Sequence, residues 1–435
     1  MKINTATTSS APFYPGKPSS GANQFYFPIY NGMDKMGYTV DFEIDWGDGT
    51  TSQVNSSNYA TACLHDYSST GGAGIYTVSA RGSVAGFNFH PLSNVANKAD
   101  GKKLVEILQW GDLKLTGGAN NSSPFPTSAG VGQVFRDCTN LTTVSASDTP
   151  WFIYNIDGSL NGFGARALFD GCSSLTTINN IANWDVSSLK TMEIMFDGCT
   201  KWEYGTNANG AINLQNWDAS RCARFERMFR GCEQFNTKMF TNVGANVSGG
   251  TPIKALSMFE DCISFTNQGL PLNSWDTSQF TNMFSMFNNC KLFNADITGW
   301  NTSNVTTMRL MFNDCTAFNQ NINSWDVSSV TDMRQMFTDA SSFDQDLRSW
   351  NVSAWSQYAL GDTPLSGPSS TFTLSTSNYD SMLVAWDAYN YPAWPGGVVD
   401  FGNSTYSLTS PGNAVANARA SLITKWGAIN DGGGV

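Results

Sequence analysis

The chain has 435 residues and a formal net charge of -11, from 35 acidic against 24 basic residues. Phosphate binding needs clustered Lys and Arg, and no such run occurs, so nucleic-acid partners are excluded and anionic membrane surfaces disfavoured. No stretch approaches the roughly 18 apolar residues of a membrane span, which excludes insertion. Only 14% of residues are charged and 13% are aromatic, a composition typical of mainly β folds.

Residues 1–24 are rich in Ser, Thr, Ala and Pro. This composition predicts an extended N-terminal arm that lies along a partner protein. The same stretch lacks the apolar core of a secretory signal. We therefore expect the protein to leave its cell by a route other than secretion, such as lysis, or to have lost a leader by trimming.

Residues 25–92 contain two alternating apolar and polar runs, YTVDFEIDWGDGTTSQV at 38–54 and HDYSSTGGAGIYTVSA at 65–80. Gly-Asp-Gly marks a turn between strands. The stretch WGDGT and the later His-x-Tyr and Gly-Ile-Tyr-Thr-Val resemble the PKD-type immunoglobulin-like domain. The resemblance implies an N-terminal β-sandwich that serves as a spacer or docking module.

Few residues of this front region could carry chemistry. Asp45 and Asp48 flank Trp46-Gly47 and could bind Ca²⁺, but a turn-stabilising role is favoured because further acidic ligands are lacking. The chain holds two histidines, His65 and His90, which leaves almost no material for a catalytic triad or a His-ligated metal. No catalytic residue, cofactor site or metal site is therefore predicted.

A repeat fills residues 93–355, led by a cap over 93–126 that contains LVEILQWGDLKL at 104–115. Its first mark is Phe-x-x-Cys, usually preceded by Met, in eight copies. These copies are Phe135 with Cys138, Phe169 with Cys172, Phe196 with Cys199, Phe229 with Cys232, Phe259 with Cys262, Phe287 with Cys290, Phe312 with Cys315, and Phe337 with Ala340 in the Cys position.

The second mark of the repeat is a Trp, followed at once by Asp or Asn and three residues later by Ser. These Trp residues are Trp184, Trp217, Trp275, Trp300, Trp325 and Trp350. The first five lie 12 residues before the next repeat Phe, whereas the distance from Cys to the next Trp varies. Insertions therefore belong at one place in each unit, and the polar residues are expected to fix turns along one corner.

The apolar spacing predicts two kinds of side in each unit. Met308, Met311, Phe312 and Cys315 lie at i, i+3, i+4 and i+7, which favours one face of a short helix. The surroundings of Ile322, Trp325 and Val330 favour a short strand opposite. Since one unit cannot bury its apolar face alone, units must stack, which predicts a solenoid of about eight rungs.

The repeat as a whole resembles the BspA-like leucine-rich-repeat surface proteins, on the pattern MFxxCxxFN followed by W[DN]xSxVTxM. LSTSNYDSMLVAW at 374–386, VDFGNSTYS at 399–407 and NARASLITKWGAINDGG at 417–433 are similar to the C-terminal cap of that family. The resemblance implies an α/β cap over 356–435 and functions that are mostly adhesive. The expected fold is thus mainly β with short helices: sandwich, leucine-rich-repeat-like solenoid and cap.

Seven of the nine cysteines occupy the repeat position, 25 to 34 residues apart. Metal binding and redox chemistry need closer Cys or His pairs, so buried free thiols are favoured, and Ala340 in the same place supports this. Disulfide scaffolding is the alternative, and the pairing of Cys63 and Cys222 is open. The sequons at Asn301 and Asn351 arise from the repeat and are interpreted as structural.

The Trp series is interpreted as core rather than as a sugar-binding platform. Aromatic residues in loops are better candidates for contacts with a ligand, although packing at a cap is the alternative. The candidates are Trp202, Tyr204, Tyr389, Tyr391 and Trp394.

These observations predict a non-enzymatic binding or structural protein displayed on a surface. The leading hypothesis is a phage virion component (a capsid decoration, fibre or receptor-binding protein). Its arm and sandwich would dock on other virion or surface proteins, and its repeats would bind a host-surface protein or glycan. A bacterial cell-surface adhesin is the alternative, and a glycan-active enzyme is a weaker one since paired carboxylates are not evident. Ligand and oligomeric state, homo-oligomers included, are left open.

Overall fold

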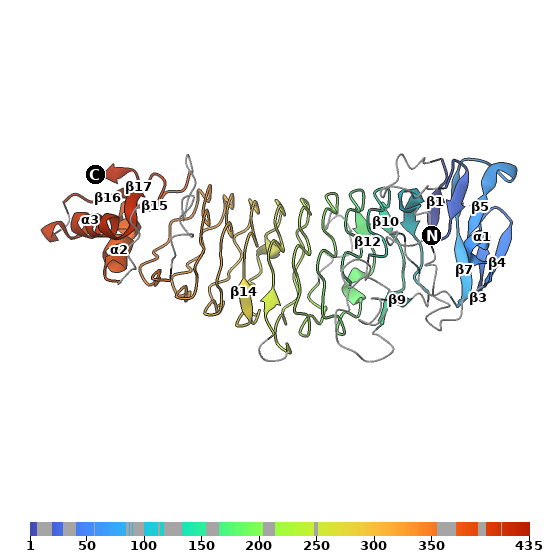
Figure 1. Ribbon diagram of the computed structural model, residues 1–435, viewed down its shortest axis with the longest axis horizontal. Helices are drawn as coiled ribbons and strands as arrows, with labels where there is room; N and C mark the ends of the chain where they lie inside the picture. The colour runs from blue at the N-terminus through green and yellow to red at the C-terminus, as the bar shows by residue number, and fades with distance from the viewer. Residues whose placement is uncertain are drawn as a thin grey trace. The chain divides into compact units, whose positions relative to one another are not determined.

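The computed structural model describes residues 1–6, 20–28, 41–55, 57–83, 87, 89, 100–111, 114–116, 133–153, 165–202, 214–247, 251–354, 371–389, 397–409 and 411–435. The chain divides into two compact units, Met1–Asp218 and Ala219–Val435, which are described separately. Figure 1 follows the chain from its N-terminus in blue to its C-terminus in red.

Short strands outnumber α-helices in the described part of both units. The first unit contains β1 (Lys2–Asn4), β2 (Gln24–Tyr26), β3 (Asp41–Asp45), β4 (Thr51–Asn55), the single-turn helix α1 (Tyr59–Ala62), β5 (Leu64–Asp66), β6 (Ile75–Thr77), β7 (Ser79–Ser83), β8 (Leu104–Ile107), β9 (Lys114–Thr116), β10 (Thr143–Val144), β11 (Trp151–Ile153) and β12 (Thr177–Ile178). The second contains β13 (Ile253–Lys254), β14 (Phe280–Asn282), α2 (Thr376–Asp387), β15 (Gly397–Asp400), β16 (Thr405–Tyr406), α3 (Ala414–Trp426), β17 (Gly427–Asn430) and β18 (Gly433–Gly434). The prediction of a mainly β fold is confirmed.

The main sheet of the first unit has the strand order β12-β10-β8-β1-β6. β10 pairs in parallel with both β8 and β12, whereas β1 is antiparallel to β6 and to β8. A second sheet, β4-β3-β7, is antiparallel throughout. β6 and β7 are separated by Val78 alone, so consecutive residues pass from one sheet to the other.

The predicted arm is wrong for its first residues. Lys2–Asn4 form β1 in the interior of the main sheet, and Ile3 is fully buried. Ile3 is a single apolar residue in a sequence segment rich in Ser, Thr and Asn. The overall composition of the segment therefore does not reveal that this side chain is buried. The remainder of the predicted arm lies largely outside the described residues.

A buried polar cluster joins residues 20–26 to the start of the repeats. Lys103 Nζ donates to Ser20 Oγ at 2.8 Å, to the Gly21 carbonyl at 2.9 Å and to the Gln24 carbonyl at 2.5 Å. Asp100 accepts from the Tyr26 amide at 2.7 Å and from the Ser20 hydroxyl. Burial of the ammonium lowers the pKa of Lys103, but these partners satisfy its three protons.

The predicted short helix of each repeat is instead a ribbon of turns. Within one repeat, the Met311 amide donates to the Met308 carbonyl and the Cys315 amide donates to the Phe312 carbonyl. The intervening amides donate to the next repeat. The Leu310 amide donates to the Arg334 carbonyl, and the Phe312 amide donates to the Met336 carbonyl. The apolar residues keep their helical spacing, but the hydrogen bonds that would continue a helix are shared with a neighbour.

Left-handed residues set this ribbon. They occur two residues before the repeat Phe, as at Leu310 with φ 58°, and two residues after it, as at Asp314 with φ 56°. Type II turns require positive φ at their third residue, which Gly, Asn and Asp tolerate best. The position after Phe follows this preference with Gly171, Gly198 and Gly231, whereas the position before it takes Ala, Ile, Arg, Ser, Leu and Gln.

The predicted strand beside Trp325 is reduced to isolated parallel bridges. Thr307 pairs with Asn282 and with Asp332, residues 25 positions apart along the chain. The described residues around Ile322 and Val330 form turns instead. In the described repeats around Phe287, Phe312 and Phe337, the parallel pairing therefore lies just before the repeat Met, whereas β10 and β12 pair after the repeat Cys.

The end of the second unit contains its two long helices. α2 packs on α3, and β15 pairs in parallel with β17. The buried residues of α2 include Tyr379, Met382 and Trp386. Tyr379 donates to Asp431, and Arg419 forms an ion pair with the same carboxylate, whose side chain is 2% exposed.

Candidate binding surfaces of the repeats and the front region

The repeat Phe rings form a stacked column in each unit. In the second unit, Phe259 lies 5.5 Å from Phe287, and Phe287 lies 5.9 Å from Phe312, each pair inclined by 2°. In the first unit, Phe135 and Phe169 are 5.4 Å apart at 12°. All eight repeat Phe residues are buried, so this column supports the surface but does not belong to it.

The Trp residues form a second column with a polar function of its own. Trp300 Nε1 donates to the Leu272 carbonyl at 2.9 Å, and Trp325 Nε1 to the Ile297 carbonyl at 3.2 Å. In both cases the acceptor residue lies three positions before the Trp of the previous repeat. Trp386 of α2 continues the series by donating to Leu347 at 3.0 Å, so the cap completes this column.

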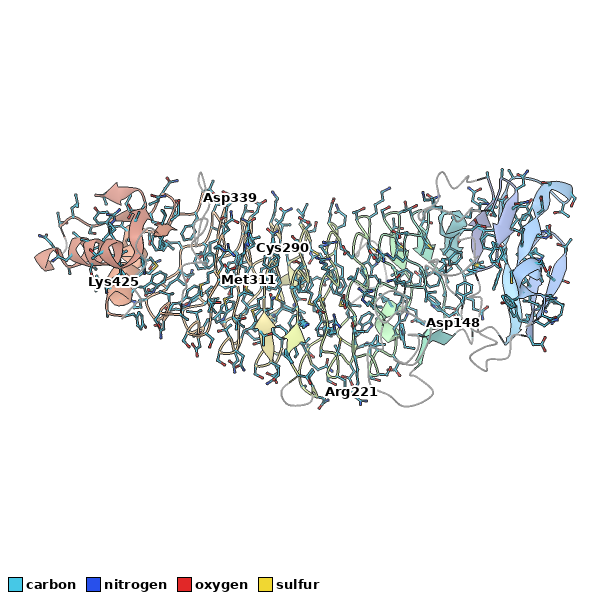
Figure 2. The ribbon with its side chains drawn as sticks, viewed as in Figure 1. Asp148, Arg221, Cys290, Met311, Asp339 and Lys425 are labelled. Atoms are coloured by element: carbon cyan, nitrogen blue, oxygen red, sulfur yellow. The ribbon has the colours of Figure 1, made fainter. Side chains whose placement is uncertain are left out.

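The repeat thiols also form hydrogen bonds to the preceding repeat. Cys290 Sγ donates to the Phe259 carbonyl at 2.9 Å, and Cys315 Sγ to the Phe287 carbonyl at 2.9 Å. Figure 2 shows Cys290 and Met311 within the stacked segments. Burial raises the pKa of Cys290 well above its usual value, which disfavours the nucleophilic thiolate. The thiols therefore act as small apolar groups that also donate a weak hydrogen bond.

Cys232 occupies the repeat position near the start of the second unit. Its side chain is fully buried, and its amide donates to the Phe229 carbonyl at 3.0 Å, which is the turn that the other units form at this place. The same Phe229 carbonyl accepts from Cys262 Sγ of the following unit at 3.0 Å. The prediction that Cys232 belongs to the buried core of the repeat agrees with this position.

We expect the thiols to resist modification until the protein unfolds. All nine cysteines are buried thiols, including Cys63 and Cys222, whose pairing the sequence left open. Ellman's reagent needs an accessible thiolate, so native protein is expected to react slowly, while protein in guanidinium should release nine equivalents. Prompt reaction of several thiols in native protein would contradict their burial, and fewer than nine after unfolding without reductant would indicate disulfides.

The polar corner after each Trp is built from local turns. Asp326 Oδ1 accepts from the Ser328 amide at 2.9 Å, and Asn301 Oδ1 from the Ser303 amide at 3.1 Å. Both sequon asparagines, Asn301 and Asn351, accept in this way. A side chain that bonds the backbone two residues on fixes a turn, which is the role that the spacing predicts.

A second polar column connects neighbouring repeats, and its members directly follow Phe293, Phe318 and Phe343 along the chain. Asn294 Oδ1 accepts from the Asn319 amide at 2.9 Å, and Asn319 Oδ1 accepts from the Asp344 amide at 3.0 Å. The column reaches the cap because Asp344 Oδ1 accepts from the Ser375 amide at 2.7 Å. Chemically, these side chains hold backbone, and the arrangement suits contact with a surface rather than turnover of a substrate.

The predicted contact residues do not form one site. Trp202 is fully buried and stacks on Phe196 at 4.2 Å, so its assignment to an exposed loop is wrong. Tyr389 is half-buried, and its carbonyl accepts from Lys425 at 3.4 Å. Tyr204, Tyr391 and Trp394 lie outside the described residues, as does His90.

The sequence offered a signal for Trp202 that was missed. A second aromatic follows the repeat Phe by six residues, and Trp202 has that spacing from Phe196. Other members of the series are buried and stacked, as Phe293 lies 4.0 Å from Phe287 and Phe318 lies 3.9 Å from Phe312. The members in the second unit are Phe235, Phe265, Phe293, Phe318 and Phe343.

The front-region turn is held by Asp48. Its Oδ1 accepts from the Thr50 amide at 3.0 Å, and its Oδ2 lies 2.7 Å from His65 Nε2 and accepts from Thr70. The His65 ring stacks on Trp46 at 4.9 Å. Asp45 accepts from the Gly47 amide at 2.9 Å, so both carboxylates have the turn-stabilising contacts that the sequence favours.

Acid is expected to weaken the front region through Asp48. Burial alone would raise the pKa of this carboxyl, but hydrogen bonds from Thr50, Thr70 and His65 outweigh it and lower the pKa far below its usual value. A carboxyl with a lowered folded pKa stabilises above its unfolded pKa, about 3.9, and this stability is lost as pH falls further. Urea midpoints measured from pH 5 to pH 2.5 should therefore fall less in Asp48→Asn than in wild type.

The matched control for this titration is Glu43→Gln, which changes a carboxyl on β3 of the same sheet. An effect that comes only from removing one negative charge should appear in both variants, so the difference between them is assigned to the Asp48 contacts. Equal slopes for wild type and Asp48→Asn would show that the Asp48 contacts do not contribute to acid sensitivity.

Two properties of the described residues concern membranes and metals. Among these residues, no helix is both long and apolar enough to cross a membrane. Within the same part of the chain, no three His, Cys, Asp or Glu side chains gather as they would around a metal ion.

Comparison with known proteins adds one family. Residues 164–267 and 253–360, together less than half of the chain, match the family described as "Mycoplasma protein of unknown function, DUF285". The two matches overlap in the repeats, as expected when one family pattern fits successive sets of units. No curated protein and no solved structure matches the chain. The repeats are therefore similar to a family whose description assigns no activity.

Proposed function

We propose that this protein is a non-enzymatic binding and structural protein displayed on a surface. Its repeats would form a leucine-rich-repeat-like solenoid of the BspA type, and its front region a PKD-like β-sandwich. The observation that supports the proposal most is the commitment of the repeat side chains to stacking. Phe, Trp and Cys are buried in columns, and Asp, Asn and Ser hold turns, so each unit extends a scaffold.

The chemistry of the thiols supports a passive role. Burial raises the pKa of Cys138, Cys172 and Cys262 well above the usual value, so these groups are poor nucleophiles near neutral pH. His65 is engaged with Asp48 in the front turn. In place of catalysis, we propose that the outer face of the repeats binds a host-surface protein or glycan.

Display on a phage virion is the narrower proposal. Nine cysteines kept as thiols suit folding in a reducing compartment, and virion proteins fold in the host cytoplasm before release. The front region would then dock on the particle and leave the repeats to contact the host. A bacterial cell-surface adhesin would use the same scaffold, so location distinguishes the two.

Immunogold electron microscopy tests this location. Antibody raised against the purified chain should label the outside of released particles if the protein is a virion component. Label on the cell envelope alone would support the adhesin and remove the virion assignment. Label confined to the cell interior, with clean particles and envelopes, would overturn surface display altogether.

A further inference from the structure

Equivalent positions of successive repeats form a row on the surface of the second unit, which we call the Arg row. Its members are Leu256, Phe284, Arg309 and Arg334. Backbone hydrogen bonds set the row, because the residue that follows each member donates to the carbonyl of the next member. The donors are the amides of Ser257, Ser285 and Leu310, at 2.8, 2.9 and 3.0 Å. All four members are partly exposed, so the row has an apolar end and a cationic end.

Arg309 is a cation that forms no ion pair among the described residues. Other cations of the second unit do pair with carboxylates, namely Arg224, Lys291, Arg334, Arg348, Arg419 and Lys425. The Nε of Arg309 is buried and has no hydrogen-bond acceptor in the described part of the chain. Since a buried N–H normally has an acceptor, this guanidinium is a candidate site for an anionic ligand.

Both neighbours of Arg309 in the Arg row suit such a ligand. The Arg309 guanidinium carbon lies 6.0 Å from the centroid of the Phe284 ring, a contact that holds a cation over an aromatic face. Arg334 binds Asp332 through Nε and Nη2, at 3.0 and 2.8 Å. A guanidinium has five N–H donors, so this pair leaves three of them for another acceptor. Two guanidinium groups at neighbouring positions are therefore held by contacts within the protein and keep donors to offer.

Threonine hydroxyls accompany the Arg row, three residues earlier in each repeat. Thr306 and Thr331 are exposed. The Thr306 hydroxyl donates to the Thr281 carbonyl at 3.0 Å, and the Thr331 hydroxyl donates to the Thr306 carbonyl at 3.2 Å. Because the proton of each hydroxyl is engaged in this way, its oxygen keeps lone pairs that can accept a hydrogen bond from a ligand.

The backbone beside the Arg row offers little to a peptide. The amides of Thr306 and Thr331 donate to the preceding repeat, and those of Met308 and Leu310 donate to the following one. A peptide that adds as a strand needs unpaired backbone groups. The groups that remain for a ligand are guanidinium donors, hydroxyl acceptors and an aromatic ring. A sugar acid offers the complement of each, namely a carboxylate, hydroxyl protons and an apolar C–H face.

We propose that the Arg row binds a linear glycan of uronic acid residues, whose chain lies along the row. One carboxylate accepts from Arg309, a neighbouring carboxylate accepts from Arg334, and a sugar ring contacts Phe284. Hydroxyls of the same sugars donate to Thr306 and Thr331. Paired positions of successive repeats are about 5 Å apart, so a chain of sugar rings contacts one repeat after another. This assignment names the ligand class of the repeats and therefore rests on the proposed function.

The test is a titration of the full chain with fluorescein-labelled oligomers, followed by fluorescence anisotropy. The β-1,4-linked hexamer of glucuronic acid should bind saturably. Cellohexaose, which has a CH₂OH group in place of each carboxylate, should bind at least about tenfold more weakly because charge-assisted hydrogen bonds are lost. Hexaglutamate, which has the carboxylates without sugar rings, should bind about fivefold more weakly. No saturation by the uronate hexamer at millimolar concentration overturns the proposal, as does equal affinity of cellohexaose. Equal or tighter binding of hexaglutamate would replace the glycan with an acidic protein segment.

Variants then locate the binding of the uronate hexamer. Arg309→Ala should weaken it about tenfold, and Arg309→Lys about threefold, because an ammonium keeps the charge but not the planar fork of donors. Arg348→Ala is the matched control, since Arg348 is exposed, pairs with Asp346 and lies outside the Arg row. It should bind as wild type does, and all three variants are first checked for the wild-type melting temperature.

Equal affinity of Arg309→Ala and wild type would overturn the Arg row as the binding place. If Arg309→Ala did not fold, wild-type affinity of Arg309→Lys would overturn it instead. Antibody labelling of particles or cell envelopes does not depend on either result, so surface display can stand when the glycan assignment fails.

Discussion

Replacing Phe287 with Ala is expected to lower the free energy of unfolding by about 3 to 5 kcal/mol. The Phe287 ring is fully buried and stacks on three others: Phe259 at 5.5 Å, Phe312 at 5.9 Å and Phe293 at 4.0 Å. Removing the ring leaves a cavity between two neighbouring repeats. Backbone hydrogen bonds between these repeats hold their turns in place, so the residues around the cavity have little freedom to fill it. Urea unfolding followed by tryptophan fluorescence measures the change.

The matched control is Leu292→Ala, in the same repeat. Leu292 is 54% exposed, so its truncation removes little buried surface and is expected to cost less than about 1 kcal/mol. If both variants unfolded at the same urea concentration, the Phe column would not be the core of the second unit.

Trp202→Ala is expected to be as damaging, again by about 3 to 5 kcal/mol. Trp202 is fully buried, its ring lies 4.2 Å from Phe196, and its amide donates to the Cys199 carbonyl at 3.0 Å. The sequence alone predicts an exposed loop residue, whose loss would leave folding intact. The two expectations differ by several kcal/mol, so one melt decides between them.

Lys201→Ala is the control for this variant, since Lys201 is the exposed neighbour of Trp202. It should unfold as wild type does. A Trp202→Ala variant with wild-type stability would restore the interpretation of Trp202 as a surface residue and leave its burial unexplained.

Much of the repeat architecture could be predicted because its signal is periodic. The constant distance from Trp to Phe reflects two buried columns, and the Asp or Asn before Ser reflects a turn that only short polar side chains fix. The six-residue spacing of the second aromatic carries equal information, but Trp202 stands directly before an insertion and resembles part of it. Its identity as Trp rather than Phe conceals the series.

The type of secondary structure could not be predicted from the same pattern. Helical spacing relates Met308, Met311, Phe312 and Cys315. Alternate amides of this stretch nevertheless donate to carbonyls of the next repeat. Apolar spacing reports which side chains are buried and does not report whether an amide bonds its own turn or a neighbour. The left-handed residues that make the difference include Leu310 and Gln335, types that give no warning of positive φ.

The burial of β1 was beyond sequence reasoning for a different reason. It depends on the pairing of Met1 with Val78 and of Ile3 with Leu104 on β8, residues far apart in the chain. The arm prediction placed the first residues outside the fold, because a single Ile among small polar residues gives a weak strand signal. Long-range pairing gives that Ile its buried position.

The alternation of backbone bonds within residues 283–289 and 308–314 has a consequence for genetic change. In these two stretches, alternate amides donate to carbonyls of the following repeat, and the columns of rings, thiols and asparagines repeat with the same step. A crossover between two neighbouring units that removes or duplicates 25 residues would rejoin equivalent chemical groups. Length variants that differ by whole units are therefore expected to fold, whereas a deletion of a few residues between Trp and Phe is not.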